Sequence, residues 1–144
     1  WLDSEGSGWV WDRITPVAGD FTGDGKSDIA VLYKYVAADV DYQSGLWVFG
    51  DVAAGKNPVF TWGVKDTVLD WDRTRLVAGD FTGDGRDDLV AAYDYYSGSA
   101  DTDGETRLYL EDVVTAEGFS MTKVWDWTAA EGNGWIWDKL RFVS

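Results

Sequence analysis

The chain has 144 residues, of which 45% are hydrophobic and 16% aromatic, a composition that can form one packed domain with a real core. Its formal net charge of −14 argues against a nucleic-acid partner, because binding a phosphate backbone requires an excess of Lys and Arg along some face. With no histidine and no cysteine, it lacks an imidazole for a catalytic triad or a zinc site and a thiol for catalysis or a disulfide.

Two further classes of protein find no support in the sequence. No apolar run is long enough to span a bilayer, so we predict no membrane-spanning segment. Nothing identifies an open metal site beside a general base, and no pair of carboxylates suited to glycoside hydrolysis stands out among the 26 acidic residues. We therefore expect a binding protein and not an enzyme.

An internal repeat organises the chain. A Trp-Asp-basic element at residues 11–13 precedes the cassette GDFTGDGKSDIAV, which begins at residue 19. Both recur sixty residues later, as Trp-Asp-Arg at 71–73 and as GDFTGDGRDDLVA from residue 79. A third Trp-Asp-basic element, at 137–139, is followed only by LRFVS. Repetition at a fixed period is the signature of a repeat architecture.

Each repeat is predicted to contain four short strands separated by Gly, Asp and Ser clusters that mark turns. In the second repeat these strands cover residues 75–81, 88–95, 106–111 and 120–127. The strand after each acidic loop, at 29–33 and 89–93, is continuously apolar, as expected for an internal strand covered on both faces. A four-stranded sheet that packs face to face with its neighbour is a β-propeller blade. The predicted fold class is therefore all-β, with two full repeats of four-stranded antiparallel blades and a partial one.

The two ends of the chain are equivalent pieces, since WLDSEGSGWVWDRITPVA at the start matches WTAAEGNGWIWDKLRFVS at the end. The predicted organisation is the end of a preceding repeat with the first strand of blade 1 at 1–18, blade 1 at 11–70, blade 2 at 71–136 and the start of a third repeat at 137–144. Two blades do not close a ring, so the remaining blades are expected from a longer parent chain or from homo-oligomerisation. The duplicated ends favour the longer parent.

The acidic loop of each cassette places oxygen atoms where a calcium ion would need them. Ca²⁺ takes six to eight oxygen ligands, which a short loop supplies best from alternate positions around a sharp glycine turn. The predicted metal ligands are Asp20, Thr22, Asp24, the backbone carbonyl of Lys26 and Asp28 in the first loop, and Asp80, Thr82, Asp84, the carbonyl of Arg86 and Asp88 in the second. We expect two structural Ca²⁺ sites that brace the blades. The alternative is a metal-free turn in which the acids cap backbone amides.

The cassettes, VAGDFTGDG followed by two residues, an Asp and an apolar strand, resemble FG-GAP or VCBS-type repeats. This family occurs in integrin-like propellers and in many secreted bacterial proteins. The resemblance covers both full repeats and implies calcium-binding propeller blades and a secreted or extracellular location. The chain departs from the family at the third loop position, where Thr22 and Thr82 stand in place of the more frequent Asn or Asp.

The ten tryptophans suggest a binding surface, because indole rings stack on the apolar faces of sugars while polar groups bind the hydroxyls. The candidate ligand-binding residues recur near the Trp-Asp elements: Trp9, Trp11, Trp71, Trp135 and Trp137. The sequence favours a carbohydrate-binding, lectin-like or cell-surface recognition module. Two alternatives stay open: the indoles wedge neighbouring blades together, or the module binds a protein as an adhesin, an assembly subunit or a targeting domain appended to a secreted enzyme.

Overall fold

The computed structural model describes residues 9–37, 40–55, 60–63, 70–95, 105–111, 121–127, 137 and 140–142. The elements in these ranges are strands and short 3-10 turns. The strands form two four-stranded antiparallel sheets, each in sequential order, which confirms the predicted all-β fold class of propeller-like blades. Within these residues, no helix has the length and hydrophobicity needed to cross a membrane.

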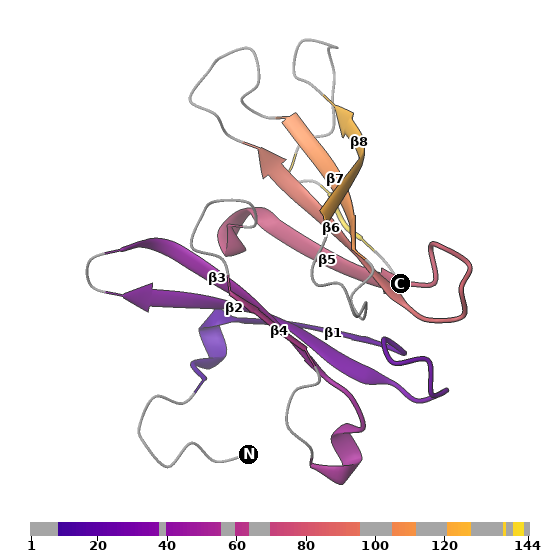
Figure 1. Ribbon diagram of the computed structural model, residues 1–144. Helices are drawn as coiled ribbons and strands as arrows, with labels where there is room; N and C mark the ends of the chain where they lie inside the picture. The colour runs from indigo at the N-terminus through magenta and orange to yellow at the C-terminus, as the bar shows by residue number, and fades with distance from the viewer. Residues whose placement is uncertain are drawn as a thin grey trace.

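The two sheets have the same order of elements. The first contains β1 (Ile14–Gly19), β2 (Asp28–Ala37), β3 (Val40–Phe49) and β4 (Phe60–Gly63). The second contains β5 (Thr74–Gly79), β6 (Asp88–Tyr95), β7 (Glu105–Glu111) and β8 (Met121–Trp127). Three 3-10 turns accompany them: η1 (Trp11–Arg13), η2 (Val52–Ala54) and η3 (Trp71–Arg73). Figure 1 shows the sheets stacked, with the loops after β1 and β5 projecting at the same end of the molecule.

Three strand boundaries of the second repeat differ from the expected ones by one residue, at the starts of β5, β7 and β8, and the end of β5 differs by two. The first strand of the second repeat was expected to continue to Phe81, but β5 ends at Gly79. The backbone amides of Phe81 and Thr82 donate instead to the Asp88 Oδ2 atom, at 3.0 and 2.9 Å. Because a carboxylate satisfies these two donors, the chain leaves the sheet two residues earlier and enters the acidic loop.

The second strand of each sheet is internal, as its apolar sequence predicts. In β2, four consecutive residues at 30–33 are buried, so both faces of the strand are covered. In β6, residues 89 and 91–93 are buried in the same way. Each of these strands pairs on both sides, β2 with β1 and β3, and β6 with β5 and β7.

The hydrophobic core lies between the two sheets. Its buried members are Phe21, Ala30, Leu46 and Val48 from the first repeat and Leu89 from the second, and Val17, Leu76 and Ala78 pack against them. Ala30 lies opposite Val48 in the β2–β3 register, and Leu46 lies two residues along on the same face. One face of β2 and β3, as far as its burial is described, therefore packs against the second sheet.

The corresponding face of the second sheet is more open. Phe21 follows β1 and is 1% exposed, whereas Phe81, its counterpart after β5, is 52% exposed. The second sheet covers Phe21, and no sheet in the described ranges covers Phe81. The same sequence position is thus a core residue in one blade and a surface residue in the next.

This difference predicts unequal effects for two matched substitutions. Phe21→Ala is expected to lower the free energy of unfolding by about 3–5 kcal/mol, because it leaves a cavity between the sheets. Phe81→Ala is expected to cost about 1 kcal/mol or less, because half of the ring is already in water. Urea unfolding followed by circular dichroism measures both values. Equal losses would show that the two sheets do not pack in this way.

Candidate functional site

The first acidic loop is organised around the Asp20 carboxylate. Its Oδ1 atom accepts the backbone N–H groups of Gly23 and Asp24, at 2.7 and 3.0 Å, and its Oδ2 atom accepts that of Gly25, at 2.8 Å. Gly25 has φ of 79°, in the left-handed region that favours glycine, so the chain can turn sharply there. One carboxylate therefore satisfies three consecutive amides of the turn.

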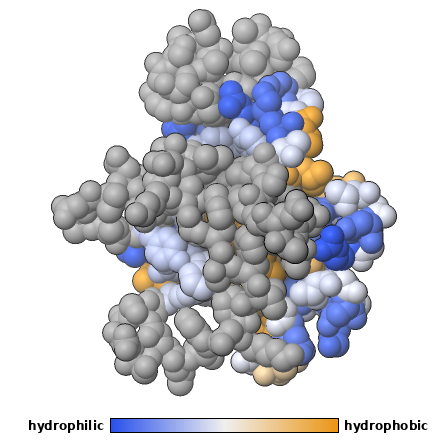
Figure 2. Space-filling view, in the orientation of Figure 1, coloured by the Kyte–Doolittle hydropathy of each residue, from blue (hydrophilic) through white to orange (hydrophobic). Residues whose placement is uncertain are grey.

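The second loop repeats this arrangement atom for atom. Asp80 accepts the N–H groups of Gly83, Asp84 and Gly85 at 2.6, 3.0 and 3.0 Å, and φ of Gly85 is 88°. Figure 2 shows hydrophilic residues gathered along the side of the molecule where the two loops project in Figure 1.

The last aspartate of each loop is buried. Asp28 is 0% exposed and Asp88 is 1% exposed. The Asp28 carboxylate accepts the amides of Thr22 and Asp51 at 2.9 and 3.2 Å, while Asp88 accepts those of Phe81 and Thr82. A buried charge is costly unless hydrogen bonds compensate it, and these backbone donors provide that compensation. Both residues therefore fix the point where the loop rejoins the sheet.

The fifth position of each loop pairs with the basic residue that follows two positions later. Lys26 Nζ donates a hydrogen bond to Asp24 Oδ2 at 3.2 Å and lies 3.8 Å from Asp51 Oδ1, and its bond to Asp24 raises the pKa of Lys26. Arg86 Nη2 lies 2.7 Å from Asp84 Oδ2, and this hydrogen bond lowers the pKa of Asp84. Asp84 therefore keeps its charge to a lower pH than an aspartate without such a partner.

The donor chemistry of the loops suits a hard divalent cation, since the predicted ligands are all oxygen atoms. However, among the residues that the structure describes, no three acidic side chains gather closely enough to hold a metal ion. The carboxylates of Asp20 and Asp80 accept backbone amides, which is the capping arrangement that formed the alternative interpretation. Hydrogen bonds from the backbone amides to these carboxylates therefore contribute to the fold of each loop.

The two loops bind each other through a residue that the sequence interpretation missed. The Asp20 N–H group donates to Asp87 Oδ2 at 2.7 Å, and the Asp87 N–H group donates to the Asp20 carbonyl at 2.8 Å. Gly19 permits this approach, because a Cβ atom there would lie 2.9 Å from Asp87 Oδ2. The corresponding residue of the first loop is Ser27, so the extra acid in GRDD was the only signal. We call these two hydrogen bonds the loop latch.

Trp9 belongs to an aromatic cluster on the outer face of the first sheet. Its ring centroid lies 5.5 Å from that of Tyr33, 5.7 Å from that of Trp47 and 5.5 Å from that of Phe49. The backbone N–H of the next residue, Val10, donates to the Tyr33 hydroxyl at 3.3 Å. These contacts favour a packing role for Trp9, in line with the wedge interpretation.

The indoles of the Trp-Asp elements differ in their surroundings. Trp11 is 79% exposed. Trp71 is half-buried, its backbone N–H donates to Ser44 Oγ at 3.1 Å, and Lys34 Nζ lies 5.5 Å from its ring. The Trp137 ring lies 4.4 Å from the Arg75 guanidinium carbon, and Trp135 lies outside the described residues. Trp71 and Trp137 thus contact the preceding repeat, whereas Trp11 offers its indole to solvent.

Comparison with known proteins adds one finding. Residues 73–110 match the FG-GAP repeat family. The second unit is therefore similar to an FG-GAP repeat over these residues. This match runs from the end of η3 through β7 and encloses the second acidic loop, which confirms the family resemblance. FG-GAP repeats suggest a protein-interaction module of the β-propeller type. Neither a curated protein nor a solved structure gives a match to the chain.

The loop latch predicts a specific loss of stability. Asp87→Ala removes a charged acceptor from the Asp20 amide and is expected to lower the free energy of unfolding by about 1–3 kcal/mol. Ser27→Ala is the matched control at the same loop position, and its cost is expected to stay within about 0.5 kcal/mol because Ser27 is exposed. Chemical denaturation compares the two. An Asp87→Ala variant as stable as the parent would mean that the loops are joined by other contacts.

Proposed function

We propose that this chain is a calcium-braced recognition module that binds a protein partner through stacked FG-GAP blades. The observation that carries this proposal is the loop latch between Asp20 and Asp87, which couples the acidic loops of neighbouring repeats. These two bonds fix the position of one loop relative to the next. A surface composed of several such loops recognises a partner only if the loops hold fixed positions relative to one another.

In this proposal the acidic loops bind Ca²⁺. In the first loop the ion would be held by Asp20, Thr22 and Asp24. In the second loop it would be held by Asp80, Thr82 and Asp84. A bound divalent ion supplies positive charge that relieves repulsion among the loop carboxylates. To bind the ion, the exposed side chains of Asp24 and Asp84 must turn inward. Asp24 would then lose its ion pair with Lys26, and Asp84 its ion pair with Arg86. Because these pairs are exposed, exchanging them costs little.

The proposal also places the protein outside the cell. Repeats of this family occur in secreted proteins, and millimolar extracellular calcium would fill sites of modest affinity. The chain has no cysteine, so disulfides cannot brace it as they brace many secreted domains. Metal-braced loops would take over that role. Its partners would then be proteins or glycans of a cell surface.

Carbohydrate recognition is the second candidate, and Trp11 is the residue that favours it. This indole is 79% exposed and so has a face available for stacking on a sugar. Trp9 and Trp71 suit the role less well, since Trp9 packs within an aromatic cluster and the Trp71 Nε1 atom is buried. The packing of these residues is the reason for placing protein recognition first.

Calcium titration tests the first part of the proposal. We expect isothermal calorimetry to show two sites and the melting temperature to rise with calcium, since a ligand at 100 times its Kd adds about 2.7 kcal/mol of stability per site. Asp20→Asn keeps one side-chain oxygen that can accept hydrogen bonds from backbone amides but removes the negative charge of the carboxylate. This substitution is therefore expected to abolish calcium binding at the first loop. Asp12→Asn, an exposed acid outside the loops, serves as the control.

The same experiment separates the two interpretations of the loops. If the acids act only as caps, Asp20→Asn lowers stability equally in calcium and in chelator, and no heat of binding is observed. That result would contradict calcium binding while leaving the blade packing intact.

A glycan array in calcium buffer tests the second candidate. If the module is a lectin, one class of sugar should bind, and Trp11→Ala should weaken that binding by roughly 10-fold, the loss expected for about 1.4 kcal/mol of stacking. Tyr35→Ala removes another exposed aromatic ring and is the control. An array without any binding would remove the carbohydrate candidate.

A further inference from the structure

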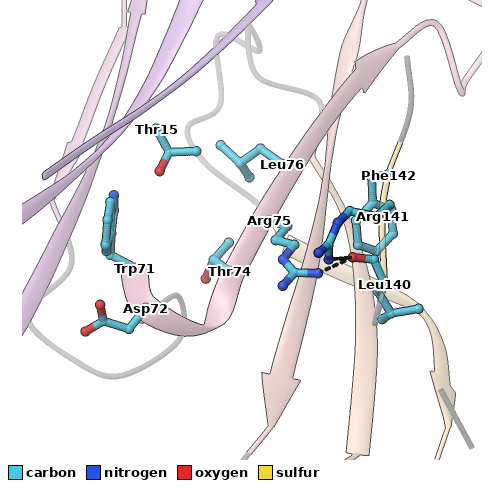
Figure 3. Close-up of a pocket in the computed structure, with 9 residues that line it drawn as sticks. All are labelled: Thr15, Trp71, Asp72, Thr74, Arg75, Leu76, Leu140, Arg141 and Phe142. Carbon is cyan, nitrogen blue, oxygen red and sulfur yellow. Dashed lines mark hydrogen bonds between the residues drawn. The ribbon is translucent and has the colours of Figure 1, made fainter. Parts of the chain in front are cut away.

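A second site lies between the two repeats, away from the acidic loops. It is a cavity of about 600 Å³ formed by β1, η3, β5 and residues 140–142. Figure 3 shows Trp71 on one side and the guanidinium groups of Arg75 and Arg141 on the other, with Thr15 and Thr74 between them. A volume of this order is typical of pockets that hold small molecules.

Three residues that line the cavity occupy the same position in successive repeats. Thr15, Arg75 and Arg141 each stand four residues after the tryptophan of a Trp-Asp element. A second cavity of about 290 Å³ is lined by residues 16–18 and 76–78 together with Phe142, so the first strands of successive repeats also meet there. The fold therefore brings side chains far apart in the sequence to a common point, where two of the three are arginines.

The two arginines meet at one oxygen atom. Arg75 Nη1 donates to the Leu140 carbonyl at 2.6 Å, and Arg141 Nη1 donates to the same carbonyl at 2.7 Å. Arg75 also donates to the Trp137 carbonyl and lies over the Trp137 ring, which fixes its orientation. Within the described part of the chain, no carboxylate pairs with Arg75, and the Asp72 carboxylate at the cavity pairs with Lys34.

We propose that this cavity binds a small organic carboxylate. Two guanidinium groups line this cavity, and their positive charge attracts an anion. The planar fork of arginine matches a carboxylate with two parallel hydrogen bonds. Trp71, Leu76 and Phe142 supply an apolar wall for the body of the ligand, which favours an organic acid over an inorganic anion.

The site stands out against the charge of the whole chain. The protein carries 26 acidic and only 12 basic residues, yet two of those basic groups converge here. The site shares no residue with the acidic loops, so the proposal does not depend on calcium. Its test is therefore done in buffer without calcium, chelator or phosphate.

The test measures binding of defined probes to the full chain. Glucuronate and phenylacetate carry a carboxylate on a sugar and on an aromatic ring, and glucose and phenylacetamide are their neutral counterparts. We expect at least one acid to bind saturably, to shift the ¹⁵N-NMR signals of the arginine side chains and the Trp71 indole, and to weaken with added salt. The acid that binds identifies the body of the ligand. Neither neutral probe nor inorganic sulfate is expected to compete.

Two substitutions complete the test. Arg141→Gln, at an exposed side chain, is expected to weaken binding by roughly 10-fold or more, since it removes a charge-assisted hydrogen bond. Lys123→Gln changes the net charge equally on an exposed position of β8 and is the control. The proposal is overturned if neither acid binds, if a neutral probe or sulfate binds as well as the acids, or if Arg141→Gln retains the parent affinity.

Discussion

Packing of one sheet face against the next repeat is the constraint on which this molecule depends. Neither sheet can bury its apolar face alone, and in the part of the chain that the structure describes the core forms where Phe21 and the first sheet meet Leu76, Ala78 and Leu89 of the second. This contact also determines where the acidic loops lie. Because equivalent loops leave equivalent strands, stacking the sheets brings Asp20 and Asp87 within hydrogen-bonding distance.

The aspartates of the acidic loops accept backbone hydrogen bonds and are also the proposed ligands of an ion. The first aspartates, Asp20 and Asp80, each accept hydrogen bonds from three backbone amides. The last aspartates, Asp28 and Asp88, are buried where the loop rejoins the sheet. These bonds account for the sharp glycine turn and for the first and last acids of each loop. An ion would act on the acid at the fifth position of each loop, Asp24 or Asp84, whose charge is paired here with Lys26 or Arg86.

Equivalent tryptophans have different structural roles in different repeats. Trp71 contacts Ser44 and Lys34 of the preceding repeat, and Trp137 stacks on Arg75 of the repeat before it. Trp11 has the same place in its own repeat and is exposed, since no earlier blade precedes it within the described residues. The indoles therefore act first as joints between units. The cavity beside Trp71 exists because such a joint leaves space between neighbouring first strands.

The sequence by itself determined the elements that arise from local chemistry. Apolar strands after the acidic loops, the turn residues and the repeat period predicted the sheets, and β6 begins and ends at the expected residues. Tertiary structure decided what depends on contacts between repeats: the burial of Phe21 but not Phe81, the latch through Asp87, and the meeting of Arg75 with Arg141. A local pattern specifies which way a side chain points along its strand. It does not specify which neighbouring surface that side chain meets, because residues sixty positions apart become adjacent only when the sheets stack.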